Sequence, residues 1–459
     1  MTAGNRLKAA RPSRHSWIRA ARAARRAPVT DSDRRPALAL SHRAAGGVAF
    51  ATSLAVFLAV FGVFPKRPWS MLDLRVYLWG GRNVRLGHNP YLHTFLPHSL
   101  HFTYTPMAAG IFALLTFLSV PAVKLLSVAA GIASLVVTLW LTTGALGRER
   151  SAARIGAVLA AAALALWLEP VRLTLSLGQV NLVLMVIVVA DLCLPDSRWW
   201  KGAGVGLAAG FKLTPLIFIP YLLLTRRFRA AAVAAGTFAV TVLVPFAAMP
   251  RASRLYWLDG LFLNPKRLGN VHYVGNQSLY GALLRLLGST AAARPYQLLA
   301  DVLIGLGGLA LAAWASRRGQ EMAGVLICAL TGLLVSPVSW SHHWVWIAPM
   351  LVALADFAAR PSSLAAAVRW RRSCWLCAAA AAVVFSGLIW AVPSPAVQGY
   401  VMTGPQQLIG DLYVLAGLAG LGMIAALMVS ARRSDQRLAV PAVARDGGEP
   451  LEPGLAAQP

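Results

Sequence analysis

Four polar residues near the ends of apolar stretches have side chains that suit group-transfer chemistry: Asp73, Lys212, His342 and His343. A carboxylate can act as a general base toward a hydroxyl, and a lysine in an apolar setting needs an anionic partner such as a phosphate. Histidines can hydrogen-bond a phosphate or a sugar, and they also bind metals. No neighbouring His or Cys stands at the spacing of a tetrahedral site, so we expect no metal.

Asp73 and Lys212 also have ordinary structural interpretations. Asp73 lies in "MLDLRVYLWGGRNVRLGHNPYLH" (71–93), whose glycines and proline predict short, bent helices, so it alternatively caps one of them. Lys212 lies in "AAGFKLTPLIF" (209–219) and alternatively extends its amine to the membrane surface. Only ten acidic residues lie between residues 44 and 430, and this scarcity favours a functional role for Asp73.

Further polar side chains in apolar surroundings are candidates for binding a substrate. They are Tyr104 in "FTYTP", Gln179 and Asn181 in "SLGQVNLVLM", Asn276 and Gln277 in "GNQSLYGALLRLL", and Trp340 in "SPVSWSHHWVW". A tyrosine at this depth is also typical of an interfacial anchor, and amides inside an apolar helix are typical of interhelical hydrogen bonds. Asn276 or Ser278 alternatively caps a helix, whereas Trp340 suits stacking on a sugar face.

The composition places the chain among membrane proteins. It is 58% hydrophobic and 13% charged, with a mean hydropathy of +0.61 and repeated apolar runs of about 20 residues. These values predict an all-α fold, a polytopic membrane helical bundle. The net charge of +27 comes from basic residues beside the apolar runs, which is how membrane topology is encoded. We therefore expect no nucleic-acid partner, and membrane lipids as the surroundings.

The positive-inside rule predicts a topology with both termini in the cytosol. Residues 46–430 form about 10–12 membrane helices, with outer loops at 65–103 and 250–295. The tails, 1–45 and 431–459, are predicted to be disordered and cytosolic.

Two stretches leave the path of the chain open. Residues 104–146 cross the membrane one or three times, and one crossing with a partly inserted segment fits their pattern. Residues 202–224 are expected to form a hairpin that is broken near Gly210 to Pro215. With this topology all the polar clusters fall on the outer side, so we expect them to form one site there, in a multi-pass protein.

Six motifs in order resemble those of glycosyltransferase family 87, the polyprenol-phosphate-mannose-dependent α-1,2-mannosyltransferases of actinobacteria. They are Asp73 with "VYLWGGRNVRLGHNPY", then "FTYTP", "GQVN", "FKLTP", "NQSLYGALLR" and "SPVSWSHH". The resemblance implies a GT-C fold in the plasma membrane, with the active site facing outside. It also implies inverting transfer of mannose from polyprenyl-phosphate-mannose to a mannoside glycolipid or glycan acceptor, with no cofactor.

The resemblance also suggests roles for individual residues. It implies that Asp73 is the catalytic base, and that Lys212, His342 and His343 contact the donor phosphate or the acceptor. Either histidine is alternatively the base, with Asp73 positioning it. Tyr77 and Arg82, in the segment after Asp73, join the candidates for donor or acceptor binding.

Two other functions remain possible from the sequence. A transporter or flippase of lipid-linked sugar would also line a cavity with polar residues, although it would be expected to contain internal repeats. A lipid-dependent transferase of another sugar, such as arabinose, would use the same kind of site. The acceptor also stays open among phosphatidylinositol mannosides, lipomannan-type glycans and glycoproteins.

Overall fold

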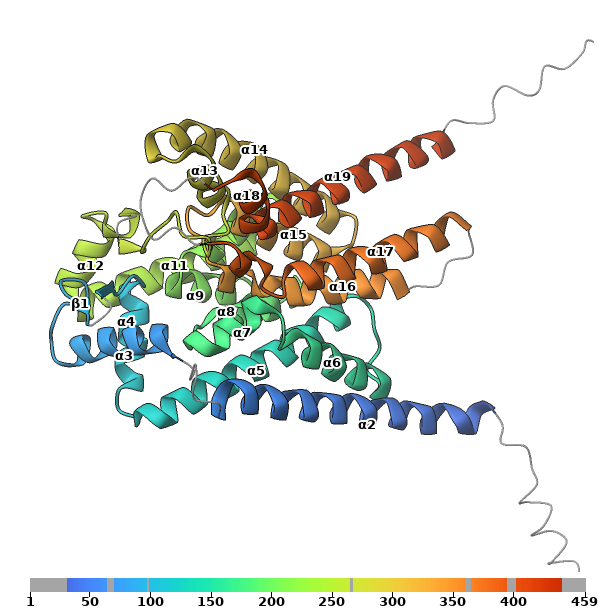
Figure 1. Ribbon diagram of the computed structural model, residues 1–459, viewed down its shortest axis with the longest axis horizontal. Helices are drawn as coiled ribbons and strands as arrows, with labels where there is room; N and C mark the ends of the chain where they lie inside the picture. Colours follow the sequence, from blue (N-terminus) through green and yellow to red (C-terminus); the bar gives the residue numbers. More distant parts are fainter. Residues whose placement is uncertain are drawn as a thin grey trace, which may run out of the picture.

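The computed structural model describes residues 31–63, 70–96, 99–264, 267–359, 365–393 and 402–439, which form an almost wholly helical bundle (Figure 1). The two strands described, β1 (Thr94–Phe95) and β2 (Leu100–His101), pair as a short antiparallel hairpin. The predicted all-α fold is therefore confirmed. Most of both predicted tails lies outside the described residues. Helices nevertheless extend into both: the first begins at Asp31 and the last ends at Ala439, so disorder is wrong for these parts.

Four described helices are long and apolar enough to cross a membrane. They are α2 (Asp31–Leu58, with the π-helical η1, Ala59–Val63), α5 (Val120–Ala145), α11 (Phe228–Ala248) and α14 (Thr290–Arg317). Two bent pairs would raise the number of spans to six: α6 (Ala152–Ala165) with α7 (Glu169–Leu177), bent by 74°, and α18 (Gly404–Gly410) with α19 (Leu412–Ala439), bent by 70°. The chain is thus a multi-pass membrane protein, and the total of 10–12 membrane helices stays a prediction.

Shorter helices fill the bundle between these spans. They are α3 (Leu72–Arg85), α4 (Pro106–Leu115), α8 (Asn181–Leu192), α9 (Ala203–Phe211), η2 (Thr214–Ile217), α10 (Phe218–Leu224), α12 (Pro250–Trp257), η3 (Leu261–Leu263), α13 (Leu279–Leu287), α15 (Glu321–Val335), η5 (Ser341–Trp346), α16 (Ile347–Ala359), α17 (Ala365–Val384) and η6 (Leu388–Ala391). In residues 104–146 the structure has one long helix, α5, and the short α4, which agrees with one crossing and a shorter segment.

The predicted break in residues 202–224 is present. Helix α9 ends at Phe211, and Lys212 adopts an extended conformation before η2 begins. Pro215 has no N–H to donate to the carbonyl of Phe211, so the helix cannot continue. The hydroxyl of Thr105 donates to the carbonyl of Gly210 at 2.5 Å and thereby satisfies the broken end of α9.

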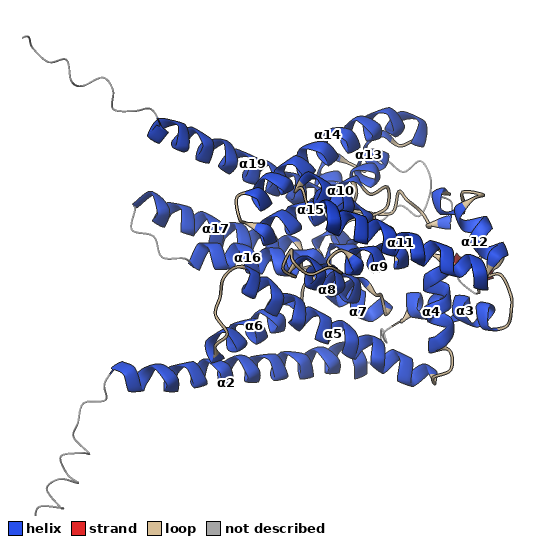
Figure 2. Cartoon of the chain, turned by 180° about the vertical axis from the view of Figure 1, so that it is seen from behind, coloured by secondary structure: helices blue, strands red, loops and turns tan. Residues whose placement is uncertain are grey.

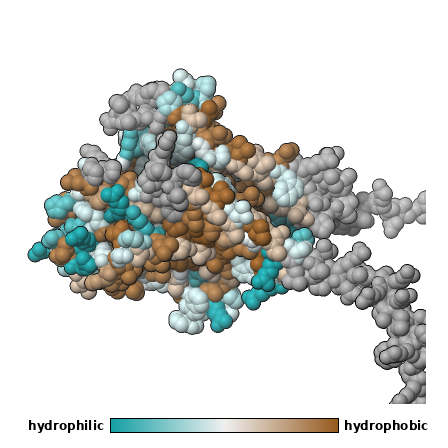
Figure 3. Space-filling view, turned by 60° about the horizontal axis from the view of Figure 1, so that its bottom comes forward, coloured by the Kyte–Doolittle hydropathy of each residue, from teal (hydrophilic) through white to brown (hydrophobic). Residues whose placement is uncertain are grey.

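Small residues allow the helices to approach closely. The backbones of α2 and α6 meet where a Cβ on Gly46 would lie 2.2 Å from the carbonyl oxygen of Gly156, so no larger residue fits there. At one end of the bundle α3, α4, α12 and the hairpin lie together, and the first residues of α2 and the last of α19 lie at the other end (Figures 1 and 2). Hydrophobic side chains cover much of the surface in Figure 3, and hydrophilic ones form a group at the end that carries α3 and smaller groups elsewhere.

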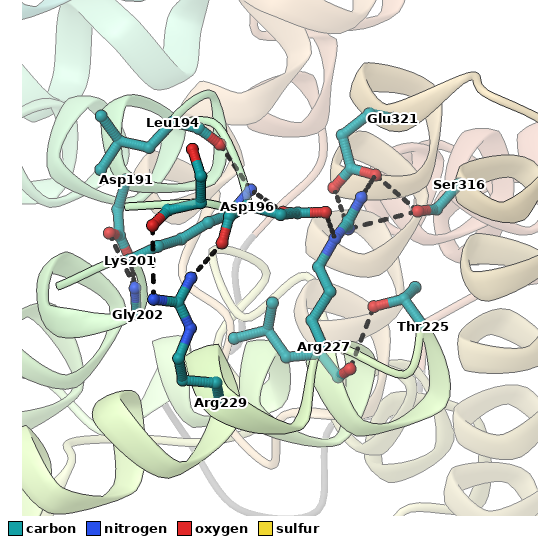
Figure 4. A network of polar contacts seen from close by, with 12 residues as sticks. Asp191, Leu194, Asp196, Lys201, Gly202, Thr225, Arg227, Arg229, Ser316 and Glu321 are labelled. Atoms are coloured by element: carbon teal, nitrogen blue, oxygen red, sulfur yellow. Dashed lines mark hydrogen bonds and ion pairs between the residues drawn. The ribbon is translucent and has the colours of Figure 1, made fainter. Parts of the chain in front are cut away.

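An ion-pair network joins three loops between helices (Figure 4). The Arg227 guanidinium forms two hydrogen bonds of 2.7 Å with the Glu321 carboxylate and also contacts Asp196. Asp196 in turn pairs with Lys201 at 2.7 Å. Because these residues come from the α8–α9 loop, the start of α11 and the start of α15, the network fixes the loops at the end of α11 opposite to α12.

Candidate active site

Helix α3 places Asp73 in its first turn. Met71, at φ 44°, is the N-cap, and its N–H donates to the carbonyl of Ser176 at 2.9 Å. The alternative that Asp73 caps a helix is therefore wrong. Helix α3 packs tightly on α4, since a Cβ on Gly81 would lie 2.5 Å from the backbone of Phe112. This packing fixes the position from which the Asp73 side chain extends.

A chain of hydrogen bonds holds the Asp73 carboxylate. Gln179 Nε2 donates to Asp73 Oδ2 at 2.5 Å, and the Tyr104 hydroxyl donates to Gln179 Oε1 at 2.9 Å. The hydroxyl of Tyr77 donates to that of Tyr104 at 2.8 Å. Three of the residues predicted from the sequence thus lie together around Asp73. Their arrangement orients the carboxylate through its Oδ2.

Asp73 lies outside the candidate spans, and its surroundings change its acidity. Burial raises the pKa of the Asp73 carboxyl from 3.8 to about 6. The hydrogen bond from Gln179 and the positive charge of Lys212 act in the opposite direction and favour the carboxylate. The group is consequently a carboxylate at neutral pH, and it is more basic than an exposed aspartate.

The Lys212 amine has two partners at the break between α9 and η2. Its Nζ donates to Asn181 Oδ1 at 2.8 Å and lies 3.0 Å from His343 Nε2. When the amine is charged, His343 Nε2 accepts this bond, so the ring proton is on Nδ1. The amine also lies 5.7 Å from the centroid of the Tyr104 ring. Lys212 therefore extends into the protein beside Tyr104, and the snorkelling alternative does not describe it.

The turn between α7 and α8 joins the two halves of the site. Gln179 holds Asp73, and Asn181, two residues later, holds Lys212. Gly178 ends α7 at φ 70°, where a Cβ would lie 2.6 Å from that of Leu74, so glycine is required. Both amides make the hydrogen bonds between segments that were the alternative to ligand contact.

The histidine pair lies on the turn before α16. The carbonyl of His342 accepts from Thr174 Oγ1 at 2.8 Å and from Asn181 Nδ2 at 2.9 Å, while the two imidazole rings lie 4.8 Å apart. His342 is buried, and its Nε2 has no hydrogen-bond partner in the described part of the chain. His342 Nε2 is thus a buried nitrogen whose hydrogen-bonding capacity none of the described residues uses.

Glu169 anchors the same turn, a role that was not predicted for it. Its fully buried carboxylate accepts hydrogen bonds from Ser341 Oγ (2.8 Å), Trp390 Nε1 (3.0 Å) and the Tyr413 hydroxyl (2.9 Å). Ser341 immediately precedes His342, so Glu169 positions the histidine pair from the start of α7. The scarcity of acids in the apolar region is the signal that could have drawn attention to it.

Asn276 and Gln277 hold the segment that precedes the histidine pair. Both are completely buried. Asn276 Oδ1 accepts from the N–H of Ser339 at 2.9 Å, and the N–H of Gln277 donates to the Ser339 carbonyl at 2.7 Å. Ser278, as expected, caps α13 by accepting from the N–H of Gly281. The observed contacts of both amides are thus with protein, and their contact with a ligand stays a prediction.

Arg82 and Trp340 lie at the edge of this arrangement. Arg82 is exposed on α3, nine residues or about 2.5 turns after Asp73. Trp340 is half-buried, with its ring centroid 6.3 Å from that of Tyr273. Neither is brought into contact with Asp73 or Lys212 by a hydrogen bond in the described residues.

A cavity opens beside Lys212 and His343. Its walls come from α8, η2, α15 and η5, and its apolar lining includes Leu184, Val188, Ile217, Phe218, Leu333 and Trp346. The polar groups gather around Lys212, His343 and Ser339. A cation and a few polar groups in an otherwise apolar cavity suit an amphipathic anion. No cluster of three or more His, Cys, Asp or Glu suited to a metal ion occurs in the described residues.

The sequence matches one family model, glycosyltransferase family 87, over residues 102–337. The chain belongs to glycosyltransferase family 87. It is 33% identical to a polyprenol-phosphate-mannose-dependent α-(1-2)-phosphatidylinositol pentamannoside mannosyltransferase of Mycobacterium tuberculosis, over 84% of this chain and 90% of the relative. It is 37% identical to a polyprenol-phosphate-mannose-dependent α-(1-2)-phosphatidylinositol mannoside mannosyltransferase of Mycolicibacterium smegmatis, over 68% of this chain and 73% of that relative. No solved structure gives a significant match.

Membership of family 87 agrees with the resemblance noticed in the motifs. The family-model match contains Tyr104, Gln179, Asn181 and Lys212. Asp73 and the histidine pair lie outside its limits. The structure nevertheless brings Asp73 and the histidines to the matched segment through Gln179, Thr174 and Asn181.

Proposed function

We propose that this family 87 protein transfers mannose from polyprenyl-phosphate-mannose to a phosphatidylinositol mannoside, forming an α-1,2 linkage. The observation that carries the proposal concerns the turn from Gln179 to Asn181: Gln179 holds the Asp73 carboxylate, and Asn181 holds the Lys212 amine. The Mycobacterium tuberculosis and Mycolicibacterium smegmatis relatives are named for this donor and for phosphatidylinositol mannoside acceptors.

The chemistry is a single displacement at the anomeric carbon. Asp73 accepts the proton of the acceptor hydroxyl, whose oxygen forms the new bond to that carbon. The bond from the carbon to the phosphate oxygen breaks, and the departing lipid phosphate keeps the electron pair. Lys212 stabilises the negative charge on the phosphate, so no acid is needed to protonate it. Attack opposite to the leaving group inverts the anomeric configuration.

The positions of the two charged groups support this mechanism. Asp73 feels the positive charge of Lys212, yet its hydrogen bond comes from Gln179, and Lys212 is bonded to Asn181 and His343. If the Asp73 carboxylate and the Lys212 amine formed a direct ion pair, they would have to separate before each reaction. Here each group keeps its own partner, so neither has to leave an ion pair before it meets the substrate.

The cavity beside Lys212 suits the lipid part of the donor. Its lining combines apolar side chains with Lys212, His343 and Ser339, which matches the amphipathic character of a lipid phosphate. A lipid-borne donor is also what a transferase needs on the outer side of a membrane, where nucleotide sugars do not normally occur. We therefore place the site outside and both termini in the cytosol.

His342 is the alternative base. Its Nε2 is buried and has no hydrogen-bond partner among the described residues, so it is available to a substrate hydroxyl. In that case Asp73 would orient the acceptor or the histidine. If Asp73 is the base, Asp73→Asn abolishes mannose transfer. If His342 is the base, a substitution of His342 abolishes it.

The test uses membranes that contain the full chain, radiolabelled polyprenyl-phosphate-mannose and a phosphatidylinositol mannoside. Wild-type protein is expected to transfer mannose from the lipid donor and not from GDP-mannose when donor synthesis is blocked. Asp73→Asn is expected to lower kcat by about 10²–10⁴-fold, as loss of a general base does. Transfer that persists in Asp73→Asn and is lost in His342→Gln would move the base to His342.

Failure of transfer by wild-type protein would contradict the proposal. Transfer of arabinose from a lipid phosphate would assign a different sugar. Movement of the lipid-linked sugar across the bilayer without transfer, retained in Asp73→Asn, would favour the flippase.

A further inference from the structure

Ser339 carries a buried hydroxyl without a protein partner. The residue is 1% exposed, and its Oγ has no hydrogen-bond partner in the described part of the chain. A hydroxyl removed from water without a hydrogen bond is costly, so such groups call for an explanation. Ser339 lines the cavity together with Lys212 and His343.

The position of this hydroxyl is fixed by the backbone on both sides. The N–H of Ser339 donates to Asn276 Oδ1 at 2.9 Å, and its carbonyl accepts from the N–H of Gln277 at 2.7 Å. Two residues later, the N–H of Ser341 donates to the carbonyl of Gly275 at 2.7 Å. The segment is thus paired like a short strand, and Ser339 cannot turn away to reach solvent.

The neighbouring serine of the same loop behaves differently. Ser336 also lines the cavity, but its Oγ donates to the carbonyl of Val338 at 2.9 Å. The loop therefore places two hydroxyls at the cavity, one satisfied by protein and one not. The missing partner is therefore specific to the Ser339 hydroxyl and is not shared by the other serine that lines the cavity.

We infer that the Ser339 hydroxyl donates a hydrogen bond to the phosphate of the lipid-linked donor, beside Lys212. The inference rests on the proposed function and adds to it a phosphate ligand that lies outside the family-model match and among none of the residues predicted from the sequence. The chemistry fits, because a phosphodiester oxygen accepts strongly from a hydroxyl and is attracted by the same cation. The apolar remainder of the cavity selects a phosphate that carries a lipid.

The test compares Ser339→Ala with Ser336→Ala, because each removes one hydroxyl from the same cavity wall. Ser339→Ala is expected to raise the KM for polyprenyl-phosphate-mannose about tenfold, as loss of a hydrogen bond to a charged group does. The KM for the acceptor should stay within about twofold. In Ser336→Ala the rise in donor KM should be clearly smaller than in Ser339→Ala, because the Ser336 hydroxyl already donates to the carbonyl of Val338. Ser339→Thr keeps a hydroxyl and is expected to retain a donor KM near that of the wild type.

Inhibitors distinguish the sources of the phosphate. Polyprenyl phosphate is expected to inhibit competitively with the donor, and about tenfold more weakly in Ser339→Ala, whereas inorganic phosphate should inhibit both proteins poorly. Equal inhibition by inorganic phosphate would overturn the lipid selectivity. An unchanged donor KM in Ser339→Ala, with active wild-type protein, would overturn the Ser339 assignment and leave the proposed function standing. Inactive wild-type protein would instead count against the proposed function.

Discussion

At the scale of single residues, the pKa of the Asp73 carboxyl predicts how the rate of mannose transfer depends on pH. Burial raises its pKa to about 6, while the hydrogen bond from Gln179 and the charge of Lys212 keep it from rising further. A base must be deprotonated, so activity is lost as the pH falls through this pKa. We expect kcat/KM for the acceptor to fall about tenfold per pH unit below a pH of about 6.

Gln179 gives this expectation a specific test. Gln179→Leu removes a hydrogen bond that favours the carboxylate, so the pKa of Asp73 rises and the acidic limb moves to higher pH. Tyr104→Phe removes a bond to Gln179 but none to Asp73, so a smaller shift is expected. The measurement is the pH profile of transfer for the three proteins. An acidic limb that does not move in Gln179→Leu would assign the limb to another group, such as a histidine.

The sequence predicted candidate site residues that the fold brings near one another, but not what each one contacts. Seven candidates form two hydrogen-bonded groups that meet at the turn between α7 and α8: Asp73, Gln179, Tyr104 and Tyr77, and Asn181, Lys212 and His343. Gln179 and Asn181, however, bind other site residues. An amide in an apolar helix looks the same in sequence whether it holds a ligand or a neighbouring side chain, because the direction of the side chain is set by tertiary packing.

At the scale of elements, α7 is the part that sets the geometry of the site. Its first residue, Glu169, holds Ser341, and its residue Thr174 holds the carbonyl of His342. The turn that follows it holds Asp73 through Gln179. A helix of nine residues thus fixes the distance between the base and the histidine turn. Because both ends are bonded, a change at Glu169 is transmitted to the donor side of the site.

Two substitutions around Glu169 separate positioning from stability. Ser341→Ala and Tyr413→Phe each remove one hydrogen bond to the same carboxylate, but only Ser341 adjoins His342. We expect Ser341→Ala to raise the donor KM about three- to tenfold, and Tyr413→Phe to leave it within about twofold, although both lower stability by about 1–3 kcal/mol. The measurements are donor KM, kcat and thermal unfolding in detergent. Equal donor KM values in the two variants would mean that Glu169 contributes to stability and does not position the histidine pair for donor binding.

Some element boundaries were predictable and some were not. The break in residues 202–224 follows from Pro215, and the division of residues 104–146 into α4 and α5 follows from Ser119 and Pro121, which begin α5. The partners of Glu169 lie 172, 221 and 244 residues away along the chain. No local pattern encodes contacts of that separation, which is why Glu169 was not assigned to the site.

At the scale of the whole molecule, the helix α11 separates two regions that are predicted to lie on opposite sides of the membrane. It has 21 residues and is about 30 Å long, enough to cross the hydrocarbon core. At its start Arg227 bonds Asp196 of the α8–α9 loop. At its other end α12 packs near the loop after α3, where the rings of Tyr91 and Tyr256 lie 5.3 Å apart. The site is expected to face outside together with this second region.

Cysteine labelling in intact cells tests this orientation. His93 and Arg198 are both exposed, one in the loop after α3 and the other in the α8–α9 loop. In a background without the four native cysteines, His93→Cys is expected to react with a membrane-impermeant maleimide in intact cells. Arg198→Cys should react only after permeabilisation, because the positive-inside rule places its loop in the cytosol.

The reverse labelling pattern would place Asp73 and Lys212 on the side of the membrane where nucleotide sugars are made. A lipid-borne donor would then no longer be required by location, although the apolar cavity beside Lys212 would still favour one. Labelling of both cysteines in intact cells would mean that α11 does not cross the membrane, and the topology would have to be redrawn from the other candidate spans. If only His93→Cys is labelled in intact cells, the site faces outside. A donor on a lipid carrier is then required, because nucleotide sugars do not normally occur there.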